Sequence, residues 1–462
     1  MSTPGVPATL QAALDERGLL AVLEQGAAAG PSARAALLRD LAAVDWAMFD
    51  RQRAALRSGP PSAPSALAPP PLAPPSTVSC PETEEAAARG WEALRAGRVA
   101  LCTVAGGQAS RLGFDGPKGA YPLGPVSGAS LFGIMAGQVA RLRQRCGVAV
   151  PWIIQTGPDN HEVTQQYFAR RNWFGLGSRT VRFVCQGTLP ALDPDGGFLL
   201  AAPGRLFRNP DGHGGFYRAL ANAGVYAELR AQGVDLLFYC QVDNPLVRMG
   251  DPAFLGHHLA AGAEMSVKVV EKTEPGEKVG LVALVDGTAS CIEYSDLSDE
   301  LAAERAEDGG LRFRAGNIAI HAFDLAFAER MAGSDLDLHL ARKQVLALDG
   351  GLDPAPRDGV KFETFVFDAL PRAARAVVQM CQREEEFAPV KNRAGNDSVL
   401  TSSQALDARN RAWCAAAGEG ILSPAANGWL EFAPGLADGP ADLFARRDEL
   451  ALACGGRLLR AR

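Results

Sequence analysis

The segment VAGGQASRLGFDGPKG, residues 104–119, places two adjacent glycines and two cationic side chains behind an apolar run. Gly106 and Gly107 allow the backbone to approach a phosphate or a base edge, because no Cβ intervenes and positive φ is allowed. Arg111 and Lys118 supply the positive charge that a polyphosphate needs. The spacing matches neither G-x-x-x-x-G-K-[ST] nor G-x-G-x-x-G, which argues against a P-loop and against a dinucleotide-binding dehydrogenase. The segment predicts a phosphate-binding loop of another kind.

Two polar residues follow later apolar runs. Asp243 ends VDLLFYCQVD, and a carboxylate at the carboxyl end of a strand in an open α/β sheet lies where ligands bind. Mg²⁺ prefers one or two carboxylates together with substrate phosphates, so Asp243 is the expected metal ligand and Mg²⁺ the expected cofactor. The alternative for Asp243 is a turn or helix cap. Gln186 follows another apolar run, and its amide can read the edge of a base with one donor and one acceptor.

Apolar runs that alternate with helical segments must position these residues. Runs at 99–105, 148–156, 180–185 and 234–243 are expected to be buried strands, and amphipathic helices are expected at 130–146 and 159–171. This alternation predicts a doubly wound, mainly parallel α/β sheet. The later runs MSVKVV, VGLVALV and ASCIEYS are closer together, which indicates antiparallel additions to the sheet.

Three regions are expected along the chain. Residues 1–98 form an N-terminal helical segment, in which Leu37, Leu41, Val44 and Met48 share one helix face. This segment contains a Pro-rich linker near 58–76, expected to form neither helix interior nor sheet and to run as an extended linker or surface strap. Residues 99–391 form the large α/β domain, and residues 392–462 form a small C-terminal domain of helix and loop.

Composition excludes several classes of protein. The 462 residues are 47% hydrophobic and 21% charged, and the net charge of −6 gives no global basic field to attract nucleic acid. The nine cysteines show no C-x-x-C spacing and are expected to be buried thiols in a reducing compartment. We find neither a signal peptide nor an apolar run long enough for a membrane span, which indicates a cytoplasmic protein. Six histidines without suitable cysteine spacing make a zinc site unexpected, and the acidic run 384–386 is expected to be a solvated face.

The string GG-x-x-x-RLG-x-x-x-PKG is similar to the loop of sugar-nucleotide pyrophosphorylases, in particular the eukaryotic UDP-N-acetylhexosamine pyrophosphorylase family. The chain departs from that family's GGQGTRLG only at Ala109 and Ser110. The resemblance continues in order over about residues 90–395. Its blocks are QGTLPAL (186–192), PDGHGGFYRAL (210–220), YCQVDNPLV (239–247), KVVEKTEPGEKVG (268–280), IEYSDL (292–297), AGNIAIH (315–321), GVKFETFVFD (359–368) and EEFAPVKN (385–392).

The resemblance implies a fold and a set of site residues. The implied fold is a doubly wound mixed sheet of the nucleotide-diphospho-sugar transferase type, which is Rossmann-like and GT-A-like, with residues 99–391 as the catalytic domain. The residues implied in UTP binding are Ala105, Gly106, Gly107, Lys118, Gln186, Gly212, Asp243 and Lys361. Those implied at the sugar phosphate are His213, Glu293, Asn317 and Lys391, and those implied in catalysis are Arg111, Lys118 and Lys391. His213 departs from the family, which carries Asn at that position of PDG-x-GG.

The activity implied is transfer of a uridylyl group from UTP to N-acetylglucosamine 1-phosphate, with release of pyrophosphate and Mg²⁺ as cofactor. The attacking phosphate oxygen is already anionic at neutral pH, so positioning and cationic stabilisation should carry the catalysis. The first alternative is another hexose 1-phosphate, such as that of glucose, galactose or N-acetylgalactosamine. The second is a non-catalytic nucleotide-sugar sensor, which the joint presence of Arg111, Lys118, Asp243 and Lys391 disfavours.

Overall fold

A computed structural model describes residues 5–28, 30–58, 66–294, 296–348, 351–418, 428–453 and 457–461. The chain forms two compact units. The larger comprises Pro64–Gln186, Phe216–Ser334 and Phe367–Arg462, and the smaller comprises Met1–Ala63, Gly187–Gly215 and Asp335–Val366. The expected regions 1–98, 99–391 and 392–462 do not coincide with these units. Residues 187–215 and 335–366 come from the central region of the sequence but belong to the smaller unit, where they pack on the N-terminal helices. As functional boundaries, those three ranges stay a prediction.

The larger unit is built on a mixed sheet with the strand order β2-β17-β11-β14-β10-β3-β4-β5. Strands β10, β3, β4 and β5 are parallel, whereas β14 is antiparallel to both β10 and β11. The hairpin of β12 and β13 extends the sheet from β14. The bounds are β2 Leu72–Ala73, β3 Val99–Val104, β4 Trp152–Thr156, β5 Val181–Cys185, β10 Leu236–Gln241, β11 Met265–Glu271, β12 Leu281–Val285, β13 Thr288–Ile292, β14 Ala315–Asp324 and β17 Ala376–Cys381.

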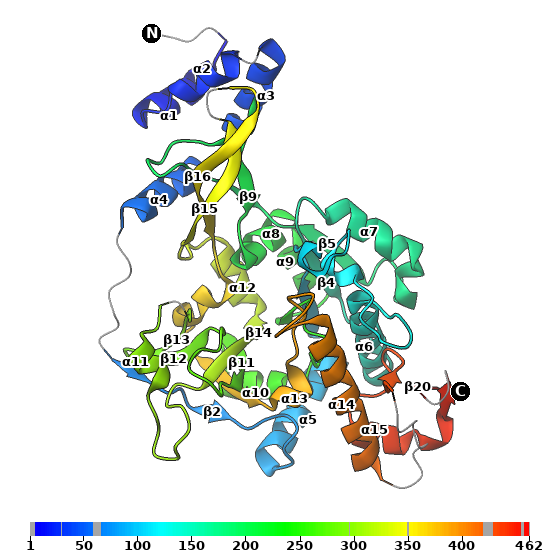
Figure 1. Cartoon of the computed structure of the whole chain (residues 1–462). Coiled ribbons are helices and arrows are strands. Elements are labelled where there is room, and N and C mark those ends of the chain that lie inside the picture. Colours follow the sequence, from blue (N-terminus) through cyan, green and yellow to red (C-terminus); the bar gives the residue numbers. More distant parts are fainter. Residues whose placement is uncertain are drawn as a thin grey trace. The chain divides into compact units, whose positions relative to one another are not determined.

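Helices cover both faces of this sheet, which confirms the doubly wound prediction. On one face, Met135 and Val139 of α6 share a buried cluster with Leu101, Trp152 and Phe238 of the strands. On this face lie α5 Pro81–Arg95, α6 Leu131–Cys146, α7 His161–Arg170 and α10 Pro252–Ala261. On the other, Tyr239 meets the ring of Phe216 edge-on at 5.1 Å between centroids. This second layer contains α8 Phe216–Asn222, α9 Val225–Ala231 and α12 Leu325–Ala332, of which α8 and α12 flank the sheet in Figure 1.

Residues 66–76 of the Pro-rich segment run as a strap along the larger unit. Leu67–Ala68 forms β1 and pairs with β12, and Leu72–Ala73 forms β2 and pairs with β17. The expectation that this stretch forms no sheet is therefore wrong at these two pairs, whose residues have the backbone N–H groups that proline lacks. Residues 59–65 lie outside the described part of the chain.

The acidic run at 384–386, which was expected to be a solvated face, contributes Glu386 to a buried ion cluster. Lys268 Nζ lies 2.5 Å from Asp251 Oδ2 and 2.5 Å from Glu386 Oε2, and all three side chains are at most 1% exposed. Burial opposes the charge on Lys268, but the two carboxylates outweigh it and raise the pKa of that ammonium. Glu386, the last residue of α13 (Arg383–Glu386), is thus buried rather than solvated, because a cation on β11 faces it.

The C-terminal residues join the larger unit and also have a small core of their own. Helix α14 (Val399–Ala417) contributes Trp413 to a cluster that includes Leu436, Leu443 and Leu459. The remaining elements of the larger unit are α11 Asp299–Ala303, α15 Pro440–Ala445, β18 Glu431–Phe432, β19 Leu450–Ala453 and β20 Leu458–Ala461. Glu431 accepts hydrogen bonds from the backbone N–H groups of Val126 and Ser127, which attaches β18 to the α/β body.

In the smaller unit the N-terminal helices pack on strand pairs formed by residues 187–215 and 335–366. Its four helices are α1 Ala8–Glu16, α2 Ala21–Ala28, α3 Pro31–Ala42 and α4 Trp46–Arg57, as expected for residues 8–57. The predicted apolar face is buried at Leu37, Leu41, Val44 and Met48. It shares a core with residues of the strand pairs β6 Thr188–Pro190 with β9 Arg208–Pro210, β7 Leu200–Ala202 with β8 Arg205–Leu206, and β15 His339–Leu348 with β16 Pro354–Glu363.

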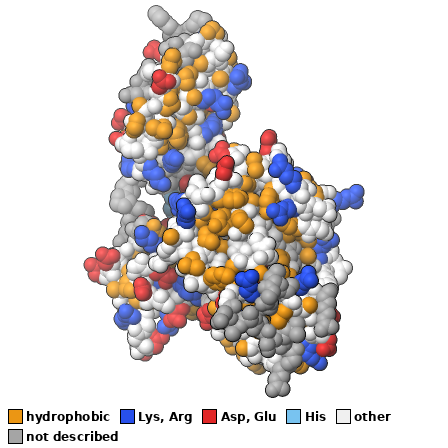
Figure 2. Space-filling model, turned by 45° about the vertical axis from the view of Figure 1, so that its right-hand side comes forward, with side chains coloured by type: hydrophobic (Ala, Val, Ile, Leu, Met, Phe, Trp, Pro, Cys, Tyr) orange, Lys and Arg blue, Asp and Glu red, His pale blue; other side chains and the backbone are white. Residues whose placement is uncertain are grey.

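The surface and the cysteines bear on the expectations drawn from composition. Acidic and basic side chains of the described residues are interspersed on the face shown in Figure 2. Among the described helices, none has the length and apolar character that crossing a membrane requires. Cys102 and Cys240 are buried free thiols as expected, whereas Cys185 is exposed, because β5 is the last strand of the sheet order. Cys454 lies outside the described residues.

Candidate active site

The predicted ligand-binding residues of the larger unit meet at one edge of the sheet. Gln241 of β10 pairs with Val104 of β3, which in turn pairs with Gln155 of β4. Because these strands are parallel, the segments that leave their carboxyl ends emerge side by side. Asp243 follows β10 and the glycine loop follows β3. Gln186 follows β5, and its N–H donates to Thr156 O at the end of β4 at 2.8 Å.

The path of the glycine loop is set by Asn160, a residue that sequence reasoning missed. Asn160 Nδ2 donates to Ala105 O at 3.0 Å and to Gly107 O at 3.2 Å, and its Oδ1 accepts from Gly157 N at 2.8 Å. The side chain is 1% exposed, so water cannot replace these bonds. Asn160 precedes α7 in the turn PDN after a buried strand, and that polar turn was the only sequence signal for it.

Two glycines of the loop are required by close packing. A Cβ at Gly106 would lie 2.6 Å from Gln186 Oε1, so the predicted uracil-reading amide lies directly against this glycine. A Cβ on Gly119, which follows Lys118, would lie 2.2 Å from the ring of Phe132. Gly107 is exposed with nothing within 4 Å of a Cβ. The backbone at Gly107 is therefore open to a ligand, while its neighbours hold the loop against the sheet.

The predicted leaving-group cation and the predicted metal ligand form an ion pair. Lys118 Nζ donates to Asp243 Oδ2 at 2.9 Å, and the two side chains are 17% and 14% exposed. The backbone brings them together, since Lys118 N also donates to Gly107 O at 3.1 Å. Arg111 is exposed on the 3₁₀ turn Ser110–Leu112, which ends at Gly113 with a φ of 71°. A polyanion at this edge would therefore meet Lys118 in a partly buried site and Arg111 at its rim.

A segment after α13 brings Lys391 to the same place. Val390 N donates to Asp243 O at 2.8 Å, which positions the next residue, Lys391, beside the end of β10. Lys391 Nζ is 3.3 Å from Asp397 Oδ2, and both side chains are about 40% exposed. Arg393, a second cation that sequence reasoning missed, has its Nη1 only 3.7 Å from where a Cβ of Gly113 would lie. Its position in VKNRAG, beside Lys391, was a signal that could have been used.

The predicted sugar-binding residues lie on the antiparallel half of the sheet. Because β14 is antiparallel to β10, its start, with Asn317, lies at the edge where β10 ends. Asn317 N donates to Gly280 O at 2.7 Å, and its Nδ2 contacts Cys291 Sγ at 3.4 Å. A Cβ at Gly280 would lie 3.5 Å from Glu293 Oε1, so Glu293 and Asn317 flank the same glycine.

Gly212, His213 and Lys361 belong to the smaller unit. Gly212 has a φ of +85°, and a Cβ there would lie 2.3 Å from Thr364 O. Val366 N donates to His213 Nδ1 at 3.0 Å, which places any proton of the neutral ring on Nε2. Burial, assisted by the neighbouring His339, lowers the pKa of His213 to about 4. Lys361 Nζ lies over the ring of Phe207 at 5.3 Å.

The donor set at Asp243 fits a hard cation that substrates help to bind. Among the described residues, no group of three or more His, Cys, Asp or Glu side chains is arranged to hold a metal alone. One partly buried carboxylate at a phosphate-binding edge is the arrangement in which Mg²⁺ takes its other ligands from phosphates and water. Asp243 would hold such an ion, with Lys118 as its present counter-charge.

Comparisons with known proteins identify the family of this chain. Residues 72–417 match the family described as UTP–glucose-1-phosphate uridylyltransferase. The chain is 35% identical to the human UDP-N-acetylhexosamine pyrophosphorylase-like protein 1 over 92% of this chain and 89% of that protein. It is 36% identical to the Saccharomyces cerevisiae UDP-N-acetylglucosamine pyrophosphorylase over 72% and 74% of the two chains.

A solved structure shares the fold. The Trypanosoma brucei uridine diphosphate N-acetylglucosamine pyrophosphorylase, crystallised with an inhibitor, superposes with a TM-score of 0.82 at 24% identity, over 100% of this chain and 99% of that one. The resemblance predicted from the glycine loop and the blocks after it is confirmed. The chain belongs to the UTP–glucose-1-phosphate uridylyltransferase family of nucleotidyltransferases.

Proposed function

We propose that this protein transfers a uridylyl group from UTP to N-acetylglucosamine 1-phosphate, yielding UDP-N-acetylglucosamine and pyrophosphate. The observation that carries the proposal is the Lys118–Asp243 pair, at 2.9 Å, beside a glycine loop whose backbone is open to a ligand. The names of the yeast and human relatives support an N-acetylhexosamine product.

In the proposed reaction, an oxygen of the sugar 1-phosphate attacks the α-phosphorus of UTP in line with the departing pyrophosphate. The attacking oxygen is an anion at neutral pH, so the protein has to align two polyanions and offset the charge that develops on the leaving group. Lys118 and Arg111 hold the triphosphate, and Lys391 holds the incoming phosphate. A Mg²⁺ held by Asp243 would add positive charge at the phosphate oxygens.

Base and sugar selection are assigned to separate parts of the edge. The Gln186 amide, held against Gly106, would pair with the uracil edge through one donor and one acceptor. Glu293 would accept hydrogen bonds from sugar hydroxyls, and Asn317 would contact the N-acetyl region. The resemblance further assigns Gly212 and Lys361 to the nucleotide.

The sugar is the point at which an alternative stays open. In this chain His213 replaces the family asparagine, and its Nδ1 already accepts a hydrogen bond from Val366 N. An amide offers an acceptor and two donors at the same place. Another hexose 1-phosphate, such as that of glucose or galactose, is therefore the second candidate substrate.

A pyrophosphate-release assay tests the proposal. The purified protein is incubated with UTP, MgCl₂ and, in turn, the 1-phosphates of N-acetylglucosamine, N-acetylgalactosamine, glucose and galactose. We expect pyrophosphate to form with N-acetylglucosamine 1-phosphate and to depend on both substrates and on Mg²⁺. Binding of UTP without pyrophosphate formation with any of the four sugars would identify a nucleotide-sugar sensor instead.

A further inference from the structure

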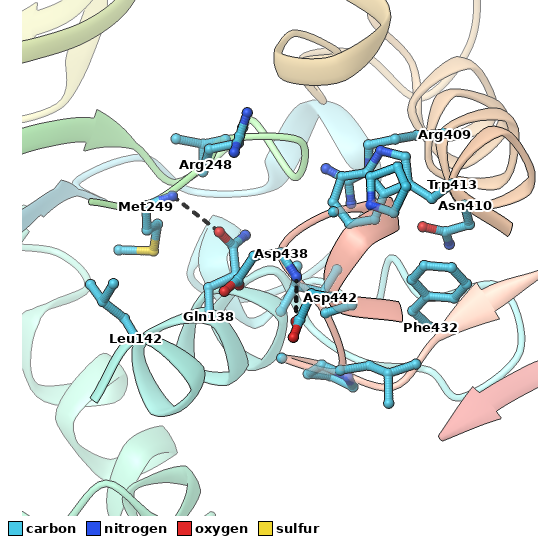
Figure 3. A pocket seen from close by; sticks show the side chains of 18 of the residues that line it. Gln138, Leu142, Arg248, Met249, Arg409, Asn410, Trp413, Phe432, Asp438 and Asp442 are labelled. Atoms are coloured by element: carbon cyan, nitrogen blue, oxygen red, sulfur yellow. Dashed lines mark hydrogen bonds between the residues drawn. The ribbon is translucent and has the colours of Figure 1, made fainter. Parts of the chain in front are cut away.

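The larger unit contains a cavity of about 560 Å³ apart from the glycine loop. Its walls come from α5, α6, the turn after β10, α14 and the residues around β18 and α15, and Figure 3 shows the side chains that line it. None of the residues assigned above to UTP, sugar phosphate or metal is part of its lining. Its volume is in the range of about 300–1,000 Å³ that organic ligands occupy in proteins.

The acidic side chains of this cavity already have direct partners. Asp438 lies 2.7 Å from Arg145 Nη1, and Asp442 pairs with Arg141. Asp251 pairs with Lys268, and Glu431 accepts from the backbone N–H groups of residues 126 and 127. A ligand in the cavity would therefore find these carboxylates engaged.

Two arginines of the cavity lack such a partner. Within the described chain, no carboxylate oxygen lies within 4 Å of the guanidinium nitrogens of Arg248 or Arg409. Arg409 Nη1 donates to Leu246 O at 3.3 Å, but its buried Nε has no hydrogen-bond partner. Burial lowers the pKa of Arg409 to about 10 with a contribution from the charge of Arg248, while Glu385 and Glu386 oppose the lowering, so Arg409 remains cationic at neutral pH. Burial also opposes the charge on Arg248, but the surrounding carboxylates outweigh it and raise the pKa of that guanidinium; they are Asp251, Glu386, Glu385 and Asp438. In Figure 3 Arg248 lies at the upper left, near Met249, and Arg409 at the upper right, near Trp413.

An unpartnered acceptor and aromatic surfaces complete the lining. Asn410 is 2% exposed, and its Nδ2 donates to Leu430 O at 3.1 Å, whereas its Oδ1 has no partner. A buried acceptor without a partner destabilises the folded chain, and a ligand N–H would supply the missing hydrogen bond. Trp91, Trp413 and Phe432 supply aromatic walls, and the rings of the last two lie 6.3 Å apart. The guanidinium of Arg145 lies over the Trp91 ring at 4.1 Å, and that of Arg409 lies over the Trp413 ring at 4.9 Å.

We propose that this cavity is a second ligand site, for a small organic anion with a flat apolar body. The anionic group would pair with Arg248 and Arg409, the body would lie among Trp91, Trp413 and Phe432, and an N–H or O–H of the ligand would donate to Asn410 Oδ1. The binding is independent of the uridylyl transfer proposed above.

The probe for this test is 8-anilinonaphthalene-1-sulfonate, which has an aromatic body, a sulfonate and one N–H. Its fluorescence is titrated against the full-length protein in the presence of saturating UTP. We expect saturable binding at one site per chain that UTP does not displace. Competition by phenyl phosphate and by benzoate then distinguishes a phosphate from a carboxylate as the preferred anionic group.

Variants locate the bound probe. Arg409→Gln and Arg248→Gln should each weaken binding by about tenfold or more, since each removes a charge-assisted hydrogen bond. Ala87→Phe keeps both arginines but fills part of the cavity and should also weaken binding. Arg182→Gln is the matched control, because Arg182 likewise donates to a backbone carbonyl, Ala223 O at 3.2 Å, but lies outside the cavity. Equal affinity in wild type, Arg409→Gln and Ala87→Phe, displacement by UTP, or no binding at all would each overturn the proposal.

Discussion

Replacing Asn160 by alanine tests whether the glycine loop is held in shape before UTP arrives. The substitution removes the donor to Ala105 O and Gly107 O and the acceptor for Gly157 N. It leaves two carbonyl groups and one N–H without these partners beneath the loop. Asn160 is the N-cap residue of α7 but its side chain makes no capping hydrogen bond, so the change acts chiefly through the three lost bonds to the loop.

The structure sets the size of the effect. Each of the three hydrogen bonds contributes about 0.5–1.5 kcal/mol net, so their joint loss amounts to about 2–4 kcal/mol. If the loop loosens while the sheet beneath it stays folded, this free energy appears in UTP binding, as a dissociation constant raised by about 30- to 1,000-fold. If the substitution instead destabilises the whole larger unit, the lost free energy appears as a lower free energy of unfolding.

Isothermal titration with UTP and urea denaturation separate these two outcomes. Asn222→Ala is the matched control, because Asn222 ends α8 as an exposed residue and its loss should leave both quantities nearly unchanged. If the Asn160→Ala variant has the same UTP affinity and the same free energy of unfolding as the wild type, the Asn160 side chain does not hold the glycine loop in shape.

Five further predictions concern the ion pairs and the histidine. Lys118→Ala should lower kcat by about 10²- to 10³-fold in steady-state assays without unfolding the protein, as for loss of a preorganised charge. Asp243→Asn should abolish Mg²⁺-dependent turnover while calorimetry still detects weak UTP binding, and full activity at low Mg²⁺ would place the metal elsewhere. Lys268→Met should lower the free energy of unfolding, measured by urea denaturation, by about 3–5 kcal/mol, because it leaves two buried carboxylates without a cation. Burial opposes the charge on Asp251, but Lys268 and Arg248, with hydrogen bonds from Lys268 and Ser76, together depress the pKa of that carboxyl. The stabilisation is therefore present above the unfolded pKa of about 3.9 and should be lost as pH falls from that value towards the depressed folded pKa. His213→Asn should increase the kcat/KM preference for N-acetylglucosamine 1-phosphate over glucose 1-phosphate, and an unchanged preference would remove His213 from sugar selection.

Much of the fold of the larger unit could be predicted, because its strands are continuous apolar runs separated by amphipathic helices. The runs at 99–105 and 234–243 became neighbouring parallel strands, and the later runs form antiparallel pairs as their spacing indicated, although β11 is also parallel to β17. The two compact units could not be predicted, since residues 187–215 and 335–366 join the N-terminal helices only through long-range packing. The strands at Leu67 and Leu72 were also missed, because the surrounding prolines dominated the local pattern.

The site was predictable where a residue's chemistry and its place after a strand agreed. Lys118 and Asp243 are 125 positions apart, and the rule that parallel strands end at one edge placed both at this edge, but their contact at 2.9 Å was not predicted. Asn160 was missed because a buried amide that satisfies backbone groups has the same sequence signature as an ordinary turn. Glu386 was misassigned because its cation, Lys268, is distant in sequence.

The most direct test of the central claim is the ratio of kcat/KM for N-acetylglucosamine 1-phosphate to that for glucose 1-phosphate, measured as pyrophosphate release with saturating UTP and Mg²⁺. A site with groups built to hydrogen-bond an N-acetyl substituent discriminates against a sugar that lacks it. We predict a ratio above about tenfold in the wild-type protein. A ratio below one would contradict the proposed substrate, and absence of pyrophosphate with either sugar would contradict the proposed reaction.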